Sequence, residues 1–323
     1  MGRVLLLLGV WWLAAPVRAQ PQSVDPVGAV QLRVINDTFA GADRWYSSHL
    51  ELGGVGALPV GLEGLHVFVR GGQVMYTSRN IQRVEPPTRD HPFGAWLYAD
   101  LGSILRRPRG LAFVRLRMGA LGDGAFAEPV QDAMHALLGV RRPQGWPNQI
   151  ADDFGWAIAA GGGGFARVPI RQWALVPAGL AVMDLGNVQR IVRAGASVGV
   201  LKGPGVAAVE HLDPAWATPP PGGGLAGGFL FGALLELRAY DRFVEGDGAP
   251  VEPAIDARPA VAQLRLGARV RWWRRRRSGR LARAGWVVGY THAWRMRTFV
   301  NVPAEDLHPA WHFWGELEVR AFF

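Results

Sequence analysis

Three separate stretches of the chain carry polar side chains of the kinds that take part in acid–base chemistry. His135 follows Gln131 by four residues in a segment that predicts a helix, so both side chains lie on one helical face. Histidine titrates near neutral pH and can activate water as a general base. Asn36 and Asp37 add an amide and a carboxylate, and Ser47 adds a hydroxyl. These residue types could form one reactive site only if the fold brought them together.

Each of these residues also has an ordinary structural interpretation. An isolated helical histidine is usually solvated, an Asn-Asp pair is a common turn signal, and Ser47 can be a simple strand residue. From its spacing alone, His135 is better explained as a solvated residue than as a catalytic one. The chemistry therefore depends on the elements that position the three stretches.

Most of the chain alternates apolar and polar residues with the period of two that predicts β-strands. In the last such segment Phe313, Leu317 and Val319 share one face, and Glu316 and Glu318 share the other. Segments of this kind begin near Ala29, Trp45, Leu65, Pro92, Gly110, Asp153, Arg171, Val188, Gly228, Val261, Arg283 and His308. Their number is even, as a bacterial single-chain transmembrane barrel requires.

The N-terminus and the composition indicate an exported membrane protein. Arg3, the apolar run Val4–Ala15 and Val17-Arg18-Ala19 together predict a signal peptide over residues 1–19. No later segment is apolar over the roughly 20 residues that a spanning helix needs, although 49% of the chain is hydrophobic. Without such helices, only a closed barrel satisfies every backbone group in lipid. We therefore predict one all-β domain over residues 20–323, a closed antiparallel transmembrane β-barrel of about 12 strands in a Gram-negative outer membrane.

The charge of the chain indicates an anionic partner. A formal net charge of +9 suits nucleic acid, an anionic membrane or an anionic substrate. Export makes nucleic acid an unsuitable partner, whereas the outer leaflet of a Gram-negative outer membrane is crowded with phosphorylated glycolipid. We expect a monomer that contacts outer-membrane lipid and lipopolysaccharide and does not bind nucleic acid. A merely solvated basic surface is the alternative.

The barrel topology would bring the three chemical stretches to one end. With both termini in the periplasm, the connections near residues 38–44, 78–91 and 122–148 all lie outside the cell. Because successive strand residues point to opposite faces, Asn36 and Asp37 can serve one site only if the strand bends or ends there.

The connection over residues 122–148 contains the predicted helix. Pro129 suits its first turn. An apolar stripe follows the helical period, and we expect it to pack against the barrel wall. The stripe consists of Val130, Met134, Leu137 and Leu138.

Several short motifs follow one another in the first half of the chain. They are Asn36-Asp37, Asp43-Arg44, Tyr46-Ser47, Gln73, Tyr76-Thr77, Asp90-His91-Pro92-Phe93, Gly119-Ala120-Leu121-Gly122, Gln131 to His135, and Gly145-Trp146-Pro147-Asn148-Gln149-Ile150. In this order and spacing they resemble the lipid A 3′-O-deacylase family of Gram-negative outer-membrane barrels. The resemblance is dense from Ile35 to Gln149 and thinner beyond, where the strand pattern and the terminal Phe323 agree.

The resemblance implies an activity, a cofactor and a set of site residues. The activity is hydrolysis, at an extracellular site, of the ester that holds the 3′-linked acyloxyacyl chain of lipid A, with Ca2+ as cofactor. The catalytic positions fall on His135, Ser47, Asn36 and Asp37, and the substrate-binding positions on Arg83, Gln131 and Tyr76. Asp37 is also the expected metal ligand.

Three residues depart from the pattern of this family. His49 stands where the family has Gly, Ser78 where it has Pro, and Val84 where it has the second of two basic residues. His49 crowds the site or adds an ionisable group, and Val84 alters the expected contact with a lipid A phosphate. The exact substrate therefore stays open.

Two mechanisms fit these residues. In the first, which we favour, His135 activates water, Ser47 or Asn36 donates to the developing oxyanion, and calcium held by Asp37 supplies positive charge. In the second, Ser47 is the nucleophile and His135 is its base.

Other functions also stay open. One is a phospholipase A-type esterase, although the Asn-Gly-x-Ser-Arg-Ser segment of that family is absent from this chain. Another is a passive anion-selective pore, lined by Arg265, Arg269 and Arg271. The last is a structural barrel whose site has degenerated.

Overall fold

The computed structural model describes most of the chain and leaves the ends and several connections undescribed. The described residues are 28–40, 45–58, 62–85, 90–202, 207–212, 224–250, 255–275, 283–300 and 310–322. The predicted signal peptide, Asp43 and Arg44 lie outside them.

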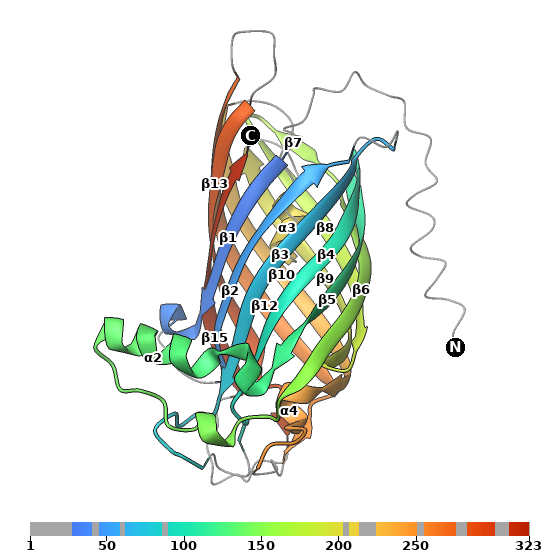
Figure 1. The fold of residues 1–323 in the computed structure, drawn as a ribbon. Coiled ribbons are helices and arrows are strands. Elements are labelled where there is room, and N and C mark those ends of the chain that lie inside the picture. The colour runs from blue at the N-terminus through green and yellow to red at the C-terminus, as the bar shows by residue number, and fades with distance from the viewer. Residues whose placement is uncertain are drawn as a thin grey trace.

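Long antiparallel strands form the body of the protein (Figure 1). They are β1 (Gly28–Asn36), β2 (Trp45–Ala57), β3 (Leu65–Thr77), β4 (Gly94–Arg107), β5 (Gly110–Leu121), β6 (Asp153–Phe165), β8 (Trp173–Gly186), β9 (Gln189–Lys202), β10 (Gly224–Asp241), β12 (Ala260–Arg275), β13 (Arg283–Met296) and β15 (Trp311–Phe322). Three short strands accompany them: β7 (Val168–Ile170), β11 (Asp256–Ala257) and β14 (Phe299–Val300).

The long strands close into a barrel because β1 pairs with both β2 and β15, and β6 pairs with β8. The predicted closed, twelve-stranded antiparallel barrel is therefore confirmed. The predicted starts of the strands match those of the structure within a few residues; for example, β10 begins at Gly224, ahead of the expected Gly228. The first residues of β10 are rich in glycine, so they show no clear alternation of apolar and polar side chains.

The alternation of residues has the direction expected of a membrane barrel. In β15, Leu317 and Val319 are exposed on the outer face, whereas Glu316, Glu318 and Arg320 are buried inside. The exposed residues thus form an apolar outer surface and the polar residues fill the lumen, the reverse of a soluble β-sandwich. Among the described residues, no helix is long and apolar enough to cross a membrane.

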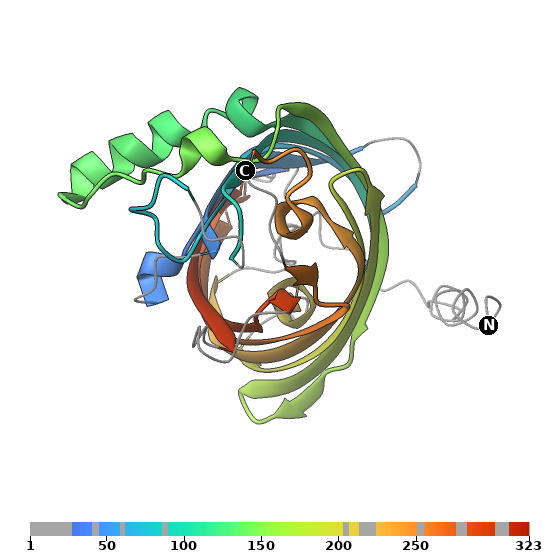
Figure 2. The ribbon, with the colours of Figure 1, turned by 90° about the horizontal axis from the view of Figure 1, so that it is seen from below.

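The lumen is filled by ion pairs and by a short helix, α3 (Ala207–Leu212), that lies inside the barrel (Figure 2). Arg265 donates to Glu316 at 2.7 Å, and Arg269 donates to Glu318 at 3.0 Å. Leu212 and its neighbours join the largest apolar cluster of the interior. Since Arg265 and Arg269 are buried and neutralised by carboxylates, the structure disfavours an open anion-selective pore.

The loop end of the barrel is the end that carries η1 (Asp37–Ala40), η2 (Gly122–Ala125), α2 (Ala127–Leu138), η3 (Trp146–Asn148) and α4 (Arg242–Glu245), as Figure 1 shows. Consecutive antiparallel strands bring these connections to one end, as the sequence predicted. An apolar cluster of Trp45, Val244, Ile255 and Phe299 lies at the same end. In Figure 2, α4 lies within the ring of strands, whereas α2 lies outside it.

Candidate active site

α2 is the helix predicted around His135. Pro129 lies in its first turn, where a missing N–H costs nothing. It ends at Gly139, whose φ of 69° lies in the left-handed region that glycine adopts most readily. Three residues of α2 are buried, namely Ala127, Gln131 and His135. The predicted helix and its polar face are thus confirmed.

The apolar stripe of α2 does not pack against the barrel wall, so that prediction was wrong. All of its members are exposed: Val130, Met134, Leu137 and Leu138. Instead, the polar Gln131 and His135 face the protein, because both find hydrogen-bond partners there. The outer wall of a membrane barrel is surrounded by lipid. An apolar stripe beside that wall can therefore be removed from water by lipid as well as by burial inside the protein.

One hydrogen bond sets the tautomer of His135. Its Nδ1 lies 2.6 Å from the carbonyl oxygen of Arg141, which follows the end of α2. A carbonyl oxygen only accepts, so Nδ1 must carry a proton and donate it. In the neutral ring, Nε2 is then unprotonated and can accept a proton from water or a hydroxyl. A backbone carbonyl thus fixes the orientation of the ring and leaves Nε2 as its acceptor atom.

Gln131 helps to hold α2 against the barrel. Its Oε1 accepts a hydrogen bond from Trp146 Nε1 at 2.9 Å. The Trp146 ring in turn lies edge-on to Phe93, with 5.1 Å between centroids. These rings belong to an apolar cluster that joins β3 and β4 to the start of α2. The hydrogen bond of the Gln131 side-chain oxygen is therefore a structural one.

α2 is attached to the outer face of the wall through β3. Gln73 Nε2 donates to the carbonyl oxygen of Ala125, just before α2, at 2.5 Å. Gln73 and Thr77 are four residues apart in one strand and therefore share a face. Val69, also on that face, is exposed on the outside. Gln73, Thr77 and the underside of α2 thus lie on the same outer side of the barrel.

Ser47 lies in an irregularity of β2. The register with β3 shifts between Tyr46 and Ser48, which marks a bulge at Ser47. Trp45, at the start of the strand, has a φ of 63°, in the left-handed region that is unfavourable for a bulky residue. The Ser47 hydroxyl is buried and lies 2.5 Å from the hydroxyl of Thr77. This contact places the Ser47 side chain beside the outward-facing Thr77.

Asn36 is the last residue of β1, and Asp37 is the first residue of η1. Asn36 is paired with Ser48 on β2, and its Oδ1 accepts a hydrogen bond from Thr38 N at 2.7 Å. Asp37 is buried, with His312 Nε2 at 4.0 Å from its Oδ2. The strand therefore ends between the two residues, which is the condition under which both could serve one site.

A glycine on β15 allows η1 to lie close to the wall. A Cβ atom built on Gly315 would lie 2.6 Å from the Cβ of Phe39 in η1. That distance is shorter than any ordinary carbon contact, so a larger residue would displace η1. The position of Asp37, at the start of η1, thus depends on the absence of a side chain at Gly315.

Arg83 is exposed on the loop between β3 and β4. This loop is tied to the segment that follows α2: Gln144 N donates to Ile81 O at 2.7 Å, and Asn148 Nδ2 donates to Val84 O at 2.8 Å. The loop with Arg83 and the segment with the partner carbonyl of His135 therefore form one unit.

Tyr76 lies on the other face of the wall. It is an odd number of residues from Gln73 in the same strand, so the two side chains point to opposite faces. Its ring stacks on Phe243 at 4.4 Å and on His91 at 5.2 Å. Phe243 belongs to α4, within the ring of strands, so Tyr76 points inward, away from the face that carries Gln73.

Asp90 holds the end of the β3–β4 loop in place. Its buried carboxylate accepts hydrogen bonds from Trp45 Nε1 at 2.9 Å, Arg79 N at 2.7 Å and His91 N at 2.8 Å. It thus connects the loop that carries Arg83 to the residue that begins the bulged strand of Ser47. Next to it, burial lowers the pKa of His91 to about 4.

A calcium ion at this end of the barrel would have Asp37 as its acidic ligand. Calcium takes six to eight oxygen ligands, including carbonyls, hydroxyls and water beside carboxylates. Within the described ranges, no group of three or more His, Asp or Glu side chains is arranged to hold a metal. The donor set near Asp37 therefore suits calcium only with neutral oxygens completing the coordination.

Comparison with known proteins identifies the family. The chain matches the family described as outer membrane protein LpxR over residues 5–323. It belongs to this family. No curated protein matches the chain in sequence. Members are outer-membrane proteins, so the barrel is an outer-membrane barrel, as the alternation and the resemblance predicted.

One of three similar solved structures shares the fold of this chain. LpxR from Salmonella typhimurium has a TM-score of 0.77 and 15% identity, covering 91% of this chain and 100% of that one. The β domain of the Bordetella autotransporter BrkA has a TM-score of 0.40 and 11% identity, covering 92% and 98%. An outer membrane channel from Pseudomonas putida F1 has a TM-score of 0.38 and 12% identity, covering 96% and 99%. The Salmonella structure thus has the same fold as this LpxR-family chain.

Sequence reasoning missed three residues around the LpxR-family site. Thr77, which touches Ser47, could have been found from its shared parity with Gln73. Asp90, like Thr77, belongs to one of the short motifs, but its three donors come from positions that no local pattern connects. His312 lies on the last strand and reaches Asp37 only because the barrel closes between β1 and β15.

Proposed function

We propose that this LpxR-family protein hydrolyses the ester that holds the 3′-linked acyloxyacyl chain of lipid A, with its site on the extracellular side of the outer membrane. The observation that carries this proposal is the tautomer of His135. A basic Nε2 on the buried side of a helix, against the outer wall of a membrane barrel, is suited to a substrate that resides in the membrane.

The chemistry requires one proton acceptor and one hydrolytic water. His135 Nε2 removes a proton from water as its oxygen attacks the ester carbonyl carbon, giving a tetrahedral oxyanion. Collapse of this species breaks the bond between that carbon and the sugar oxygen. The imidazolium returns its proton to the departing alkoxide, so the products are the acyloxyacyl fatty acid and the free 3′ hydroxyl of lipid A.

Donors near the wall would stabilise the oxyanion. The hydroxyls of Ser47 and Thr77 and the amide of Asn36 are candidates, and removal of one such donor typically costs a hundredfold or more in rate, roughly 3 kcal/mol. Calcium, bound by Asp37 and neutral oxygens, would add positive charge at the same place.

The hydrogen bonding of Ser47 favours water over a serine nucleophile. Ser47 pairs with Thr77, and the described contacts of His135 are to the Arg141 carbonyl and not to Ser47. A nucleophilic serine needs its base within hydrogen-bond reach. Hydroxylamine added during turnover decides between the two: a serine mechanism yields a hydroxamate of the released acid from the acyl-enzyme, whereas the water mechanism yields the free acid alone.

Arginines near His135 would bind the phosphates of the substrate. Arg83 is exposed on the loop tied to the segment after α2, and Arg141 and Arg142 are exposed on that segment. Guanidinium groups bind phosphate through paired hydrogen bonds. Since Val84 replaces a second basic residue beside Arg83, we propose that Arg141 or Arg142 takes over part of this contact. Tyr76 would contribute to phosphate binding only indirectly, by stacking on His91 at the end of the loop that carries Arg83.

The experiment that tests the proposed function is mass spectrometry of lipid A from a Gram-negative host that expresses the protein. We expect loss of the 3′ acyloxyacyl mass with the wild type and with Glu128→Ala, which changes the exposed side of α2. We expect unchanged lipid A with His135→Ala. Unchanged lipid A with a correctly assembled wild-type barrel would refute the proposal, and loss of a phospholipid acyl chain instead would favour the phospholipase alternative.

A further inference from the structure

α2 has three chemically different sides. The buried side carries Ala127, Gln131 and His135. One flank is apolar and exposed, with Leu137 at 79% and Met134 at 48% of full exposure. The other flank carries two carboxylates, Glu128 and Asp132. At about 100° per residue, the buried side lies between the apolar and the acidic flanks.

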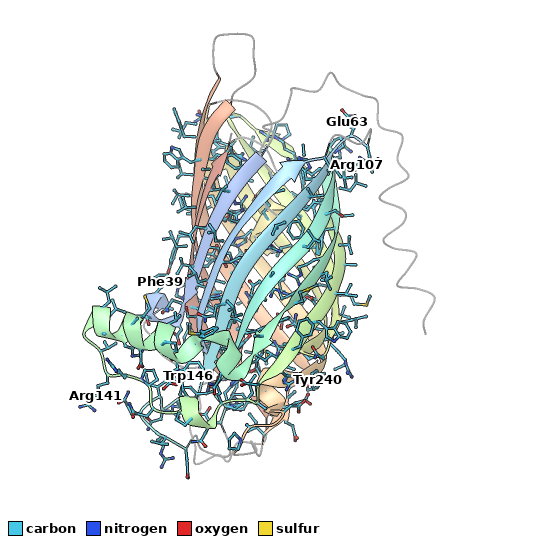
Figure 3. All side chains as sticks on the ribbon, in the orientation of Figure 1. Phe39, Glu63, Arg107, Arg141, Trp146 and Tyr240 are labelled. Carbon is cyan, nitrogen blue, oxygen red and sulfur yellow. The ribbon has the colours of Figure 1, made fainter. Side chains whose placement is uncertain are left out.

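The exposed apolar side continues beyond the helix. Phe126, just before α2, is 63% exposed, and Phe39 of η1 is 49% exposed. Figure 3 shows Phe39 on the flank of the barrel that carries α2. Exposed large apolar residues gathered on one flank mark contact with another apolar phase.

The outer faces of β5 and β6 also carry exposed apolar residues at the loop end of the barrel. Phe154, at the start of β6, is 58% exposed, and it pairs with Ala120, next to the end of β5. Trp156 and Met118 follow it on the same outer face and are also exposed. The apolar belt of the barrel therefore extends to the loop end, where the chain leaves β5 and enters α2. The exposed apolar residues of α2 thus follow in the chain after the apolar outer face of β5, with Phe126 exposed between them.

We propose that α2 lies in the interface of the outer leaflet, with its apolar flank among lipid acyl chains and its acidic flank toward water. An amphipathic helix lying in the plane of a membrane has this distribution, with its apolar face at the boundary of headgroups and acyl chains. The buried side, which faces the barrel, then holds His135 at the depth of that boundary. Arg141 and Arg142, directly after the helix, add positive charge where lipid phosphates lie.

The occupant of this surface is lipid and not a second copy of the chain. A protein partner would require a surface of complementary shape, whereas the exposed apolar residues here are distributed over η1, α2, β5 and β6, as suits contact with a fluid phase. This position of the helix does not depend on ester hydrolysis.

Spin labels test this position directly, because the chain contains no cysteine. Leu137→Cys places a nitroxide on the apolar flank, and Glu128→Cys places a matched control on the acidic flank of the same helix. The labelled proteins are folded into vesicles of phosphatidylglycerol and phosphatidylethanolamine. Collisions with oxygen, which concentrates in the acyl region, are compared with collisions with a water-soluble nickel chelate.

We expect oxygen to relax the label at residue 137 faster than the nickel chelate does, and the reverse at residue 128. Equal, water-like access to the chelate at both positions would overturn the proposal. Protection of residue 137 from both reagents, with spin–spin broadening, would also overturn it and indicate a second copy on this surface. Heat-modified migration on a gel shows for each variant that the barrel has folded, and Met134→Cys gives a second apolar position should Leu137→Cys fail to fold.

Discussion

Replacement of Asp90 should loosen the loop that carries Arg83 while leaving the barrel closed. The Asp90 carboxylate is 1% exposed and accepts three hydrogen bonds, from Trp45 Nε1, Arg79 N and His91 N. Two of these donors share Oδ1, and Arg79 N uses Oδ2. The three donors come from the beginning of β2 and from both ends of the loop, so their loss affects Ser47 and Arg83 together.

The cost of this change follows from the number of donors left without an acceptor. Each unsatisfied buried donor costs roughly 1–3 kcal/mol, so Asp90→Ala should weaken the loop by about 3 kcal/mol or more. Asp90→Asn keeps an oxygen for Trp45 and His91 and loses the acceptor of Arg79 N, at a cost of about 1–2 kcal/mol. Asp132→Ala, which removes the ion pair of half-buried Asp132 with exposed Arg142, is the control and should cost under about 1 kcal/mol.

Amide hydrogen exchange in detergent or vesicles measures this loosening. With about 1.4 kcal/mol for each factor of ten, we expect the Arg79 and His91 amides to exchange roughly a hundredfold faster in Asp90→Ala and roughly tenfold faster in Asp90→Asn. The strand amides of β9 should not change. If Asp90→Ala protects these amides as well as Asp132→Ala does, Asp90 does not hold the loop and the reasoning is refuted.

Three further perturbations test other parts of the structure. Gly315→Val should displace η1 and reduce lipid A deacylation with the barrel folded, since even a Cβ atom would lie 2.6 Å from Phe39; an active, folded variant would contradict the role given to this contact. Because burial holds the pKa of His91 at about 4 against about 6.5 unfolded, the unfolded state alone takes up this proton between those values, so the free energy of unfolding should fall by about 3 kcal/mol as pH falls from 6.5 to 4. Urea titrations should show this pH dependence reduced by that amount in His91→Phe, and an unchanged profile would refute it. Chelation of calcium should abolish deacylation and its re-addition restore it, and full activity after exhaustive chelation would remove the metal from the mechanism.

Local patterns predicted the barrel because strand alternation needs only neighbouring residues. The twelve strands and the gathering of the loops at one end follow from that alternation and from antiparallel order, and the helix around His135 follows from its helical spacing. The bulge at Ser47 could not be predicted in the same way, since it depends on the register between β2 and β3.

The orientation of α2 shows a different limit of sequence reasoning. Amphipathic spacing identifies an apolar side but not the medium that this side faces. Leu137 was expected against the wall and is exposed, because Gln131 and His135 find partners in Trp146 and the Arg141 carbonyl. Tyr76, by contrast, could have been placed from the sequence, because its odd separation from Gln73 already puts it on the opposite face of one strand.

The rate of deacylation by purified protein tests the central role of His135 most directly. Lipid A in mixed micelles is incubated with enzyme in excess, and release of the acyloxyacyl acid is followed over a single turnover. We predict that His135→Ala lowers this rate by about a hundredfold to ten-thousandfold, while Glu128→Ala on the exposed side of the same helix keeps the wild-type rate. A His135→Ala variant that is folded and as fast as the wild type would contradict the assignment of this histidine as the base.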